Sequence, residues 1–293
     1  MADYHVHLHK HGPYDGDGPP PGQYPIDHIE AYVETALTRG ANEIAFTEHL
    51  YRCVESRAVL GKWWKADPRK DLREYAKSYV RAERVLSLER YVQAVVDAKD
   101  RGLPVLLGLE VDFFPETAEP VADFLEPYPF DLLVASTHWV GAWGVDLPDH
   151  AFEFDRRGPV QSYEDYFRIE TELAASGLFD VLAHADVIKK QGLRLADAPS
   201  DLYEALAVAA ARGGTAVEVS TAGLYQKAQE MYPAKPLLQR FYHHRVPITL
   251  ASDAHVPTNT ARDRDKALAL ARSVGYTEQI QFRKRIGRMV PLG

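Results

Sequence analysis

The 293-residue chain contains a single cysteine, Cys53, and this scarcity restricts both its redox chemistry and its metal chemistry. One thiol cannot form an intramolecular disulfide, and chains without disulfides are typical of a reducing compartment such as the cytoplasm. Zinc modules built from several cysteines are excluded for the same reason, so any metal ion would need histidine and carboxylate ligands. We therefore expect a cytoplasmic protein whose metal chemistry, if it has any, uses no thiolate.

Long apolar runs and an excess of positive charge are also missing. No apolar stretch approaches the roughly 18 residues of a membrane-spanning helix, and the first predicted strand follows Met1 directly, which leaves no room for a signal peptide. The 34 Lys and Arg residues are outnumbered by 42 Asp and Glu residues, so the net charge is −8. We therefore expect no membrane partner, and the acidic balance argues against broad contact with nucleic acid.

No glycine-rich phosphate loop follows the first predicted strand, which disfavours an open doubly wound sheet. The chain instead alternates short apolar strands with helical segments, without a linker, a composition shift or a repeat. The predicted strands are residues 4–8, 43–47, 104–111, 130–137, 180–183, 215–219 and 247–251. This alternation predicts one domain over residues 1–293, a closed or nearly closed (β/α) barrel, with the open sheet as the alternative. One long helix is predicted from about Leu72 to Arg101, and the residues after 274 are predicted to form a tail.

Histidines gather at the ends of these predicted strands. His5 and His7 lie two residues apart on the first strand and should project from one face. Such barrels carry their chemistry at the C-terminal ends of their strands. The other residues predicted at this rim are His49, Glu110, His138, His184, Asp253 and His255. A pair of strand histidines alone could be half-buried residues that bind nothing, but six on one rim favour a site for zinc, iron or manganese.

The size of this cluster exceeds the needs of one tetrahedral ion and suits two or three divalent ions that share ligands. At such a site a bridging hydroxide can attack while another ion steadies the leaving oxygen. A covalent route has less support, because no serine lies in a Gly-x-Ser-x-Gly turn and Cys53 has no activating pattern. The sequence therefore predicts metal-assisted hydrolysis.

Short motifs around these residues resemble those of the polymerase and histidinol phosphatase (PHP) family. They are HVH at 5–7, FTEH at 46–49, GLE at 108–110, STH at 136–138, AHAD at 183–186 and SDAH at 252–255. The resemblance extends over nearly the whole chain. Two longer stretches, residues 138–150 and 220–224, resemble the histidinol-phosphate phosphatase branch of that family. The family resemblance implies a distorted seven-stranded (β/α) barrel with a trinuclear metal site that hydrolyses phosphoesters.

The resemblance also implies which residues hold each ion. The implied ligand sets are His5, His7, Glu110 and Asp253; Glu110, His138 and His184; and His49, His255 and one residue of the first loop. Glu110 would then bridge the first two ions. The family usually has a histidine where this chain has Pro13, so we favour His11 as the loop ligand, with His9 and Asp15 as alternatives.

The reaction implied by the branch is hydrolysis of L-histidinol phosphate to L-histidinol and phosphate, with Glu110, Asp253 and His255 as the catalytic residues. A metal-bridging hydroxide would attack phosphorus in line. Many members of the branch carry basic residues where this chain has Tyr225 and Gln226. We therefore expect other cations to bind the phosphate, namely Lys190 or Arg262, with Lys189 and Arg52 as further candidates.

Two other functions remain open at this stage, and a third is disfavoured. A related PHP enzyme could act on nucleotides or oligonucleotide ends, and a deaminase or other amidohydrolase also uses His-x-His on a barrel strand. A non-catalytic PHP module would lack ligands that are present here. The predicted partner is a small phosphorylated substrate, and the sequence is compatible with a homo-oligomer without specifying one.

Overall fold

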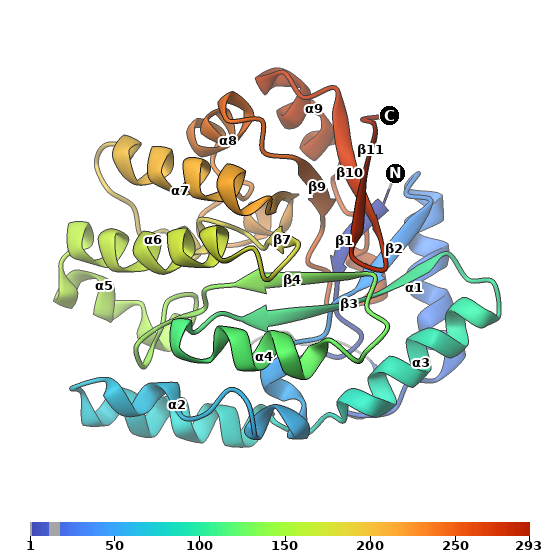
Figure 1. The fold of residues 1–293 in the computed structure, drawn as a ribbon, viewed down its shortest axis with the longest axis horizontal. Coiled ribbons are helices and arrows are strands. Elements are labelled where there is room, and N and C mark those ends of the chain that lie inside the picture. The colour runs from blue at the N-terminus through green and yellow to red at the C-terminus, as the bar shows by residue number, and fades with distance from the viewer. Residues whose placement is uncertain (1, 12–17) are drawn as a thin grey trace.

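The computed structural model describes residues 2–11 and 18–293, in which seven parallel strands form a barrel surrounded by helices (Figure 1). In spatial order the strands are β1 (Ala2–Val6), β2 (Glu43–Phe46), β3 (Val105–Asp112), β4 (Leu132–Ser136), β7 (Val181–Leu182), β8 (Ala216–Ser220) and β9 (Ile248–Ala251). The chain after β9 returns to β1, where the backbone N–H of His7 donates to the carbonyl of Ala254 at 2.8 Å. The distorted seven-stranded (β/α) barrel is therefore confirmed, and the open sheet is excluded.

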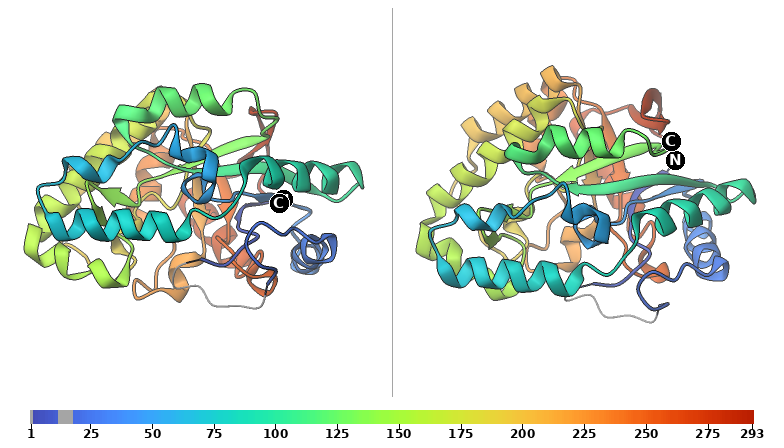
Figure 2. Two further views of the ribbon diagram at one scale, coloured as in Figure 1. Left: turned by 90° about the horizontal axis from the view of Figure 1, so that it is seen from below. Right: turned by 60° about the horizontal axis from the view of Figure 1, so that its bottom comes forward.

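The helices lie outside the barrel, as the views in Figures 1 and 2 show. They are α1 (Ile26–Thr38), α2 (Lys70–Glu83), α3 (Leu88–Asp100), α4 (Ala118–Leu125), α5 (Phe152–Arg157), α6 (Pro159–Ser176), α7 (Ser200–Gly213), α8 (Lys235–His243) and α9 (Arg264–Val274). Each long helix buries one apolar face; α3, for example, buries Leu88, Val92 and Val95 at helical spacing. Among the described residues, no helix has both the length and the apolar character to cross a membrane.

The single helix predicted from Leu72 to Arg101 is wrong, because residues 84–87 interrupt it. The N–H of Leu86 donates to the carbonyl of Arg52 at 2.9 Å, which ties this segment to the turn after β2. The side chain of Ser87 then accepts from the backbone N–H of Arg90 and caps the new helix. Tertiary hydrogen bonds and a cap therefore outweigh a periodicity that continues through the break.

A second apolar layer fills the inside of the barrel. Its members are Ala2, Tyr4, Ala45, Leu106, Leu132, Val134, Val181, Ala183, Ala216 and Phe282. Phe282 belongs to a hairpin of β10 (Glu278–Arg283) and β11 (Ile286–Pro291), so the tail predicted for this segment is wrong. The Phe282 N–H donates to the hydroxyl of Tyr4 at 3.3 Å, and Arg283 pairs with Glu43. The hairpin therefore closes the barrel at the N-terminal ends of its strands.

Strand β1 is irregular at the point where its histidines begin. Its pairing register with β2 shifts between Asp3 and Val6. Tyr4 contributes to the inner apolar layer, yet His5, the next residue, also faces inward, because its Nδ1 lies 2.8 Å from Glu218 on β8. Strict alternation would put these two side chains on opposite faces, and an irregularity in pairing can re-aim a side chain in this way.

A buried acid on α6 makes stability depend on pH. Glu170 is fully buried, and burial raises its pKa from the usual 4.5 to about 8. The unfolded chain therefore releases this proton at lower pH than the folded chain. The contribution of protonated Glu170 to the free energy of unfolding is complete below about pH 4.5 and is lost as pH rises to about 8. Between these values the free energy of unfolding falls by at most about 1.4 kcal/mol per pH unit.

We expect Glu170→Gln to flatten this slope, since glutamine does not titrate. The variant should match the wild type near pH 4.5 and exceed its free energy of unfolding near pH 8. Urea unfolding of both proteins at several pH values between these limits measures the difference. Parallel stability curves for the two proteins would show that Glu170 does not titrate in this window.

Candidate metal centre

Two imidazoles and two carboxylates converge at the C-terminal ends of β1, β3 and β9. Nε2 of His5 and Nε2 of His7 lie 3.0 Å apart, and Oε2 of Glu110 lies 3.3 Å and 3.5 Å from them. Oδ1 of Asp253 lies 3.7 Å and 3.3 Å from the same two nitrogens. Ligand atoms bound about 2.0–2.1 Å from a tetrahedral zinc ion stand roughly 3.3 Å apart. These four side chains therefore fit the first shell of one ion.

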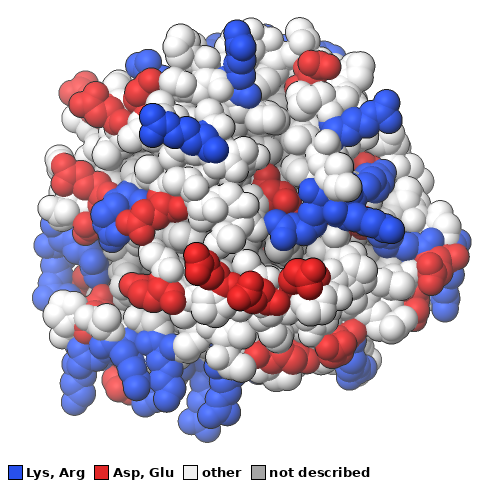
Figure 3. Space-filling view, in the orientation of Figure 1, with Lys and Arg blue, Asp and Glu red and all other residues white. Residues whose placement is uncertain are grey.

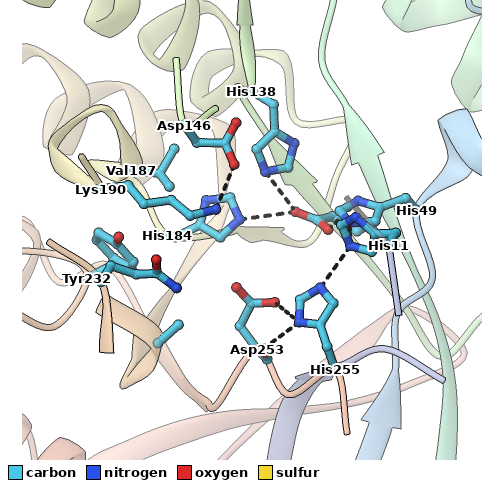
Figure 4. Close-up of a pocket in the computed structure, with 13 residues that line it drawn as sticks. His11, His49, His138, Asp146, His184, Val187, Lys190, Tyr232, Asp253 and His255 are labelled. Atoms are coloured by element: carbon cyan, nitrogen blue, oxygen red, sulfur yellow. Dashed lines mark hydrogen bonds and ion pairs between the residues drawn. The ribbon is translucent and has the colours of Figure 1, made fainter. Parts of the chain in front are cut away.

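The other oxygen of Glu110 faces a second pair of imidazoles. Oε1 lies 3.1 Å from Nε2 of His184 and 3.6 Å from Nε2 of His138. In Figure 4 the dashed lines from the rings of His138 and His184 meet at one oxygen atom. The Glu110 carboxylate thus has one oxygen toward His5 and His7 and the other toward His138 and His184. This is the arrangement that a bridging carboxylate requires.

A third group joins the first loop to two strand ends. Nε2 of His11 lies 2.8 Å from Nε2 of His49 and 2.8 Å from Nε2 of His255. An imidazole nitrogen carries at most one proton, so hydrogen bonds do not account well for three nitrogens at one point. His9, an alternative loop ligand, turns away, because its Nε2 lies 2.9 Å from the carbonyl oxygen of Gln23. Asp15 lies outside the described residues, and the geometry favours His11.

The surrounding charges set the protonation of this cluster. Burial and neighbouring imidazoles lower the pKa of His7, His11 and His255, which favours the neutral form that binds metal. Burial alone would raise the pKa of Glu110 and Asp253, but the adjacent histidines outweigh it and hold both well below the ordinary range. These three imidazoles and two carboxylates therefore favour the neutral and ionised forms respectively, the donor set of zinc, iron and manganese sites.

The buried carboxylates of the centre require a compensating positive charge. Burial opposes protonation of His5 and His138, yet nearby carboxylates raise both pKa values, that of His138 to about 10. Buried acids at such a site need a compensating positive charge, and bound divalent cations would supply it in place of protons. Among the described residues, the groups with donor atoms close enough for one ion are His7, His11, His49 and His255; His5, His7 and Glu110; His5, His184 and Glu218; and His49, Glu110 and His138. The residues present therefore fit a multinuclear metal centre.

Two carboxylates that sequence reasoning missed orient the histidines from behind. Glu218 faces Nδ1 of His5 at 2.8 Å and also accepts from the backbone N–H of His184 at 2.7 Å. Asp112 faces Nδ1 of His138 at 2.9 Å. Such partners fix the ring orientation and tautomer of a ligand. Their signals were in the sequence, since Glu218 is an isolated acid in an apolar strand and Asp112 follows Glu110 on the same strand face.

The loop after β9 holds Asp253 in a strained backbone conformation. Asp253 has φ of 53°, in the left-handed region that residues other than glycine rarely adopt. Asp3 secures the loop by accepting from the N–H and hydroxyl of Ser252 and from the N–H of Ala261. Such strain persists only where the surroundings impose it, and it is concentrated at functional sites.

The metal-ligand candidates open into a pocket of about 360 Å³. It is lined by His11, His49, Glu110, His138, Asp146, His184, Val187, Lys190, Ala222, Gln226, Tyr232, Asp253 and His255. Histidines and charged side chains make up most of this lining. The pocket is therefore suited to a small polar ligand beside the metal-ligand cluster.

Of the cations predicted to bind phosphate, only Lys190 is among the described residues that line this pocket. The prediction of Arg262 is not supported, because its guanidinium lies over the ring of Tyr225, 3.0 Å from the centroid. Lys189 donates to Asp186, Glu230 and the carbonyl of Met231, and Arg52 is buried against carbonyls of the first loop. Lys190 is also paired, with Asp146 at 2.7 Å, but it differs from the other three candidates in lining the pocket.

Comparisons with known proteins agree with this geometry. A family model described as the PHP domain matches residues 6–222. A probable histidinol-phosphatase of Deinococcus radiodurans is 34% identical over 254 residues, which cover 87% of this chain and 90% of that protein. The histidinol-phosphatase of Bacillus subtilis is 26% identical over 250 residues, which cover 78% of this chain and 87% of that protein.

The fold is also similar to that of a solved structure. The histidinol phosphate phosphatase of Lactococcus lactis, complexed with zinc, L-histidinol and phosphate, superimposes with a TM-score of 0.66. The two sequences are 19% identical, and the match covers 98% of each chain. At this level of identity the similarity establishes the barrel and its connectivity.

Proposed function

This chain belongs to the PHP domain family, and we propose on that basis that it is a metal-dependent phosphomonoesterase that hydrolyses L-histidinol phosphate. Water and the phosphomonoester would give L-histidinol and inorganic phosphate. The 34% identity to a probable histidinol-phosphatase over 87% of the chain supports the choice of substrate. The observation that carries the proposal is the Glu110 carboxylate, whose two oxygens face separate sets of imidazoles beside a pocket containing Lys190.

The proposed ligands are the nine residues predicted from the sequence. They are His5, His7, His11, His49, Glu110, His138, His184, Asp253 and His255. The chemistry supplied by two or three divalent ions at such a centre is activation of water near neutral pH and neutralisation of phosphate charge. Zinc is present in the Lactococcus lactis structure, and iron and manganese suit the same donors.

The protein's own groups would then position the substrate and move protons. Lys190 would donate to a phosphate oxygen and offset its charge. Glu110 would fix the distance between the imidazoles of His5 and His7 on one side and those of His138 and His184 on the other, since each of its oxygens faces one pair. Asp253 lines the pocket and presents Oδ1 to His5 and His7, so we assign its Oδ2 to accept a proton from the attacking water and pass it to the departing alcohol oxygen. His255, which also lines the pocket, is the second candidate for this proton.

We predict that Lys190→Met lowers kcat/KM for L-histidinol phosphate by about 10- to 100-fold, mainly through KM. A hydrogen bond to a charged group contributes about 1.5–3 kcal/mol, and a phosphate dianion is present in both the bound substrate and the transition state. Steady-state assays of phosphate release measure the change. Lys227→Met is the matched control, because Lys227 is exposed and does not line the pocket. Equal losses in both variants would argue against phosphate binding by Lys190.

The proposed substrate is tested by phosphate release from L-histidinol phosphate, sugar phosphates, nucleoside monophosphates and a phosphodiester, with metal analysis of the same sample. The expected result is a kcat/KM for L-histidinol phosphate well above those for the other compounds. Faster cleavage of nucleotides or of the diester would instead identify a different PHP phosphoesterase. The net charge of −8 gives nucleic acid little general attraction, and acidic side chains are interspersed with basic ones over much of the face in Figure 3.

A further inference from the structure

The metal-side pocket continues into a second hollow with a different lining. The second hollow encloses about 280 Å³ and shares four lining residues with the first, namely His11, His49, His138 and Asp146. Its remaining lining is Tyr51, Tyr79, Trp139 and Leu147. The first hollow is thus lined mainly by histidines and charged side chains of the metal-ligand cluster, whereas the second is lined in addition by three aromatic side chains. A substrate with a phosphate at one end and a ring at the other would extend through both.

The chain places Asp146 at the junction of these two hollows. After His138 it forms a short hairpin of β5 (Trp139–Val140) and β6 (Trp143–Gly144), and the N–H of Val145 donates back to the carbonyl of His138 at 2.9 Å. Asp146 therefore returns to the rim beside His138. Figure 4 shows its carboxylate directed toward Lys190, whose Nζ donates to Oδ2 at 2.7 Å.

Asp146 is the only residue other than histidine that lines both hollows among the described parts of the chain. Burial would raise the pKa of its carboxyl, but Lys190 and His138 outweigh burial and hold the pKa below its ordinary value. The side chain is 14% exposed, so it is accessible to a ligand without being fully hydrated. An anion at this position suits a cationic group of the substrate better than a second phosphate.

We propose that Asp146 recognises the ammonium group of the substrate and so selects phosphate esters of amino alcohols. The inference rests on the proposed function, because it assigns a specificity residue to the same site. In L-histidinol phosphate the ammonium-bearing carbon is next to the ester methylene, so the ammonium group lies close to the phosphate. Binding would move Lys190 from Asp146 to the phosphate and put the ammonium group in its place. The imidazole would then lie against the aromatic side of the second hollow, where Tyr79 and Trp139 contact each other edge to face with ring centroids 5.8 Å apart.

A carboxylate that only positioned Lys190 would affect every phosphomonoester equally, whereas one that binds the ammonium group affects only substrates that carry it. The test therefore uses a matched pair, O-phosphoethanolamine and ethyl phosphate, which differ by one ammonium group. Hydrolysis of both, and of L-histidinol phosphate, is measured with the metal-loaded wild type, Asp146→Asn and Asp149→Asn. Asp149 is the control, because it lies exposed on the same loop and lines neither hollow.

We expect Asp146→Asn to lower kcat/KM at least about tenfold for the two ammonium compounds relative to ethyl phosphate, since the amide carries no negative charge to pair with the ammonium group. Isothermal titration with L-histidinol, which has the amine but no phosphate, should show binding weakened by a similar factor. Asp149→Asn should match the wild type in both assays. Equal losses for O-phosphoethanolamine and ethyl phosphate, or unchanged binding of L-histidinol, would overturn the inference.

These measurements also separate the inference from the proposed function. A wild type that hydrolyses O-phosphoethanolamine better than ethyl phosphate but fails to hydrolyse L-histidinol phosphate would contradict the proposed substrate. Loss of that preference in Asp146→Asn would then still support ammonium recognition by Asp146. A wild type that hydrolyses L-histidinol phosphate but shows no ammonium preference in the matched pair would support the function and contradict the inference.

Discussion

Replacing Glu110 with glutamine should lower kcat for the proposed substrate by at least about 10³-fold, more than the roughly 10- to 100-fold that loss of an outer-shell partner usually costs. The amide keeps the shape of the side chain but loses its negative charge, and one of its two polar atoms becomes a donor. Glu110 has Oε2 toward His5 and His7 and Oε1 toward His138 and His184. One substitution should therefore disturb two ligand sets at once.

The measurement pairs turnover with metal analysis. Glu110→Gln should retain less metal per chain than the wild type, while circular dichroism shows that it remains folded. Glu218→Gln is the matched comparison, because Glu218 is an equally buried strand glutamate that contacts the imidazole of His5 from behind. The kcat of Glu218→Gln should fall by only about 10- to 100-fold, as is usual for the loss of a residue that orients a metal ligand. Near-normal turnover with full metal content in Glu110→Gln would refute the bridging role.

Removal of metal by a chelator should abolish phosphate release and lower the melting temperature. Ions that bind the folded chain only, present at about 1,000 times their Kd, stabilise it by about 4 kcal/mol. For a chain of this size each kcal/mol corresponds to about 2–4 °C, so a decrease of roughly 10 °C is expected. The carboxylates of Glu110, Glu218 and Asp112 are buried beside imidazoles, and bound cations would compensate their negative charge.

Scanning calorimetry before and after chelation measures this loss, and the separate return of zinc, manganese or iron(II) shows which ion restores activity. Glu110→Gln should show a smaller change in melting temperature than the wild type, because it has fewer ions to lose. A metal-free sample with full activity and an unchanged melting temperature would contradict the metal centre itself.

The order of strands and the identity of the metal-ligand candidates could be predicted because both depend on local signals. An apolar strand followed by a histidine or an acid recurs along the chain, and parallel strands of a barrel bring their C-terminal ends to one rim. His49, His138 and His184 therefore meet in the structure although about 135 residues separate the first from the last. The resemblance to the PHP family depends on the same short motifs.

Other features depend on contacts between distant segments, which no local pattern contains. The break at residues 84–87 depends on a backbone bond to Arg52, and the inward turn of His5 depends on an irregular pairing of β1 with β2. In the sequence, Lys190 and Arg262 cannot be told apart as phosphate ligands, because both are positively charged and both follow predicted strand ends. Only the structure shows that one lines the pocket while the other lies over Tyr225.

The sequence by itself therefore determined the barrel, the residues at its rim and the class of chemistry that histidines and acids can perform there. The tertiary structure decided which side chains lie close enough to share an ion, which carboxylates contact them from behind and which cation lines the pocket. The physical reason is one of range. Strand propensity and ligand type are properties of a few neighbouring residues, whereas ligand separations of about 3 Å between β1, β3 and β9 are set by the packing of the whole barrel.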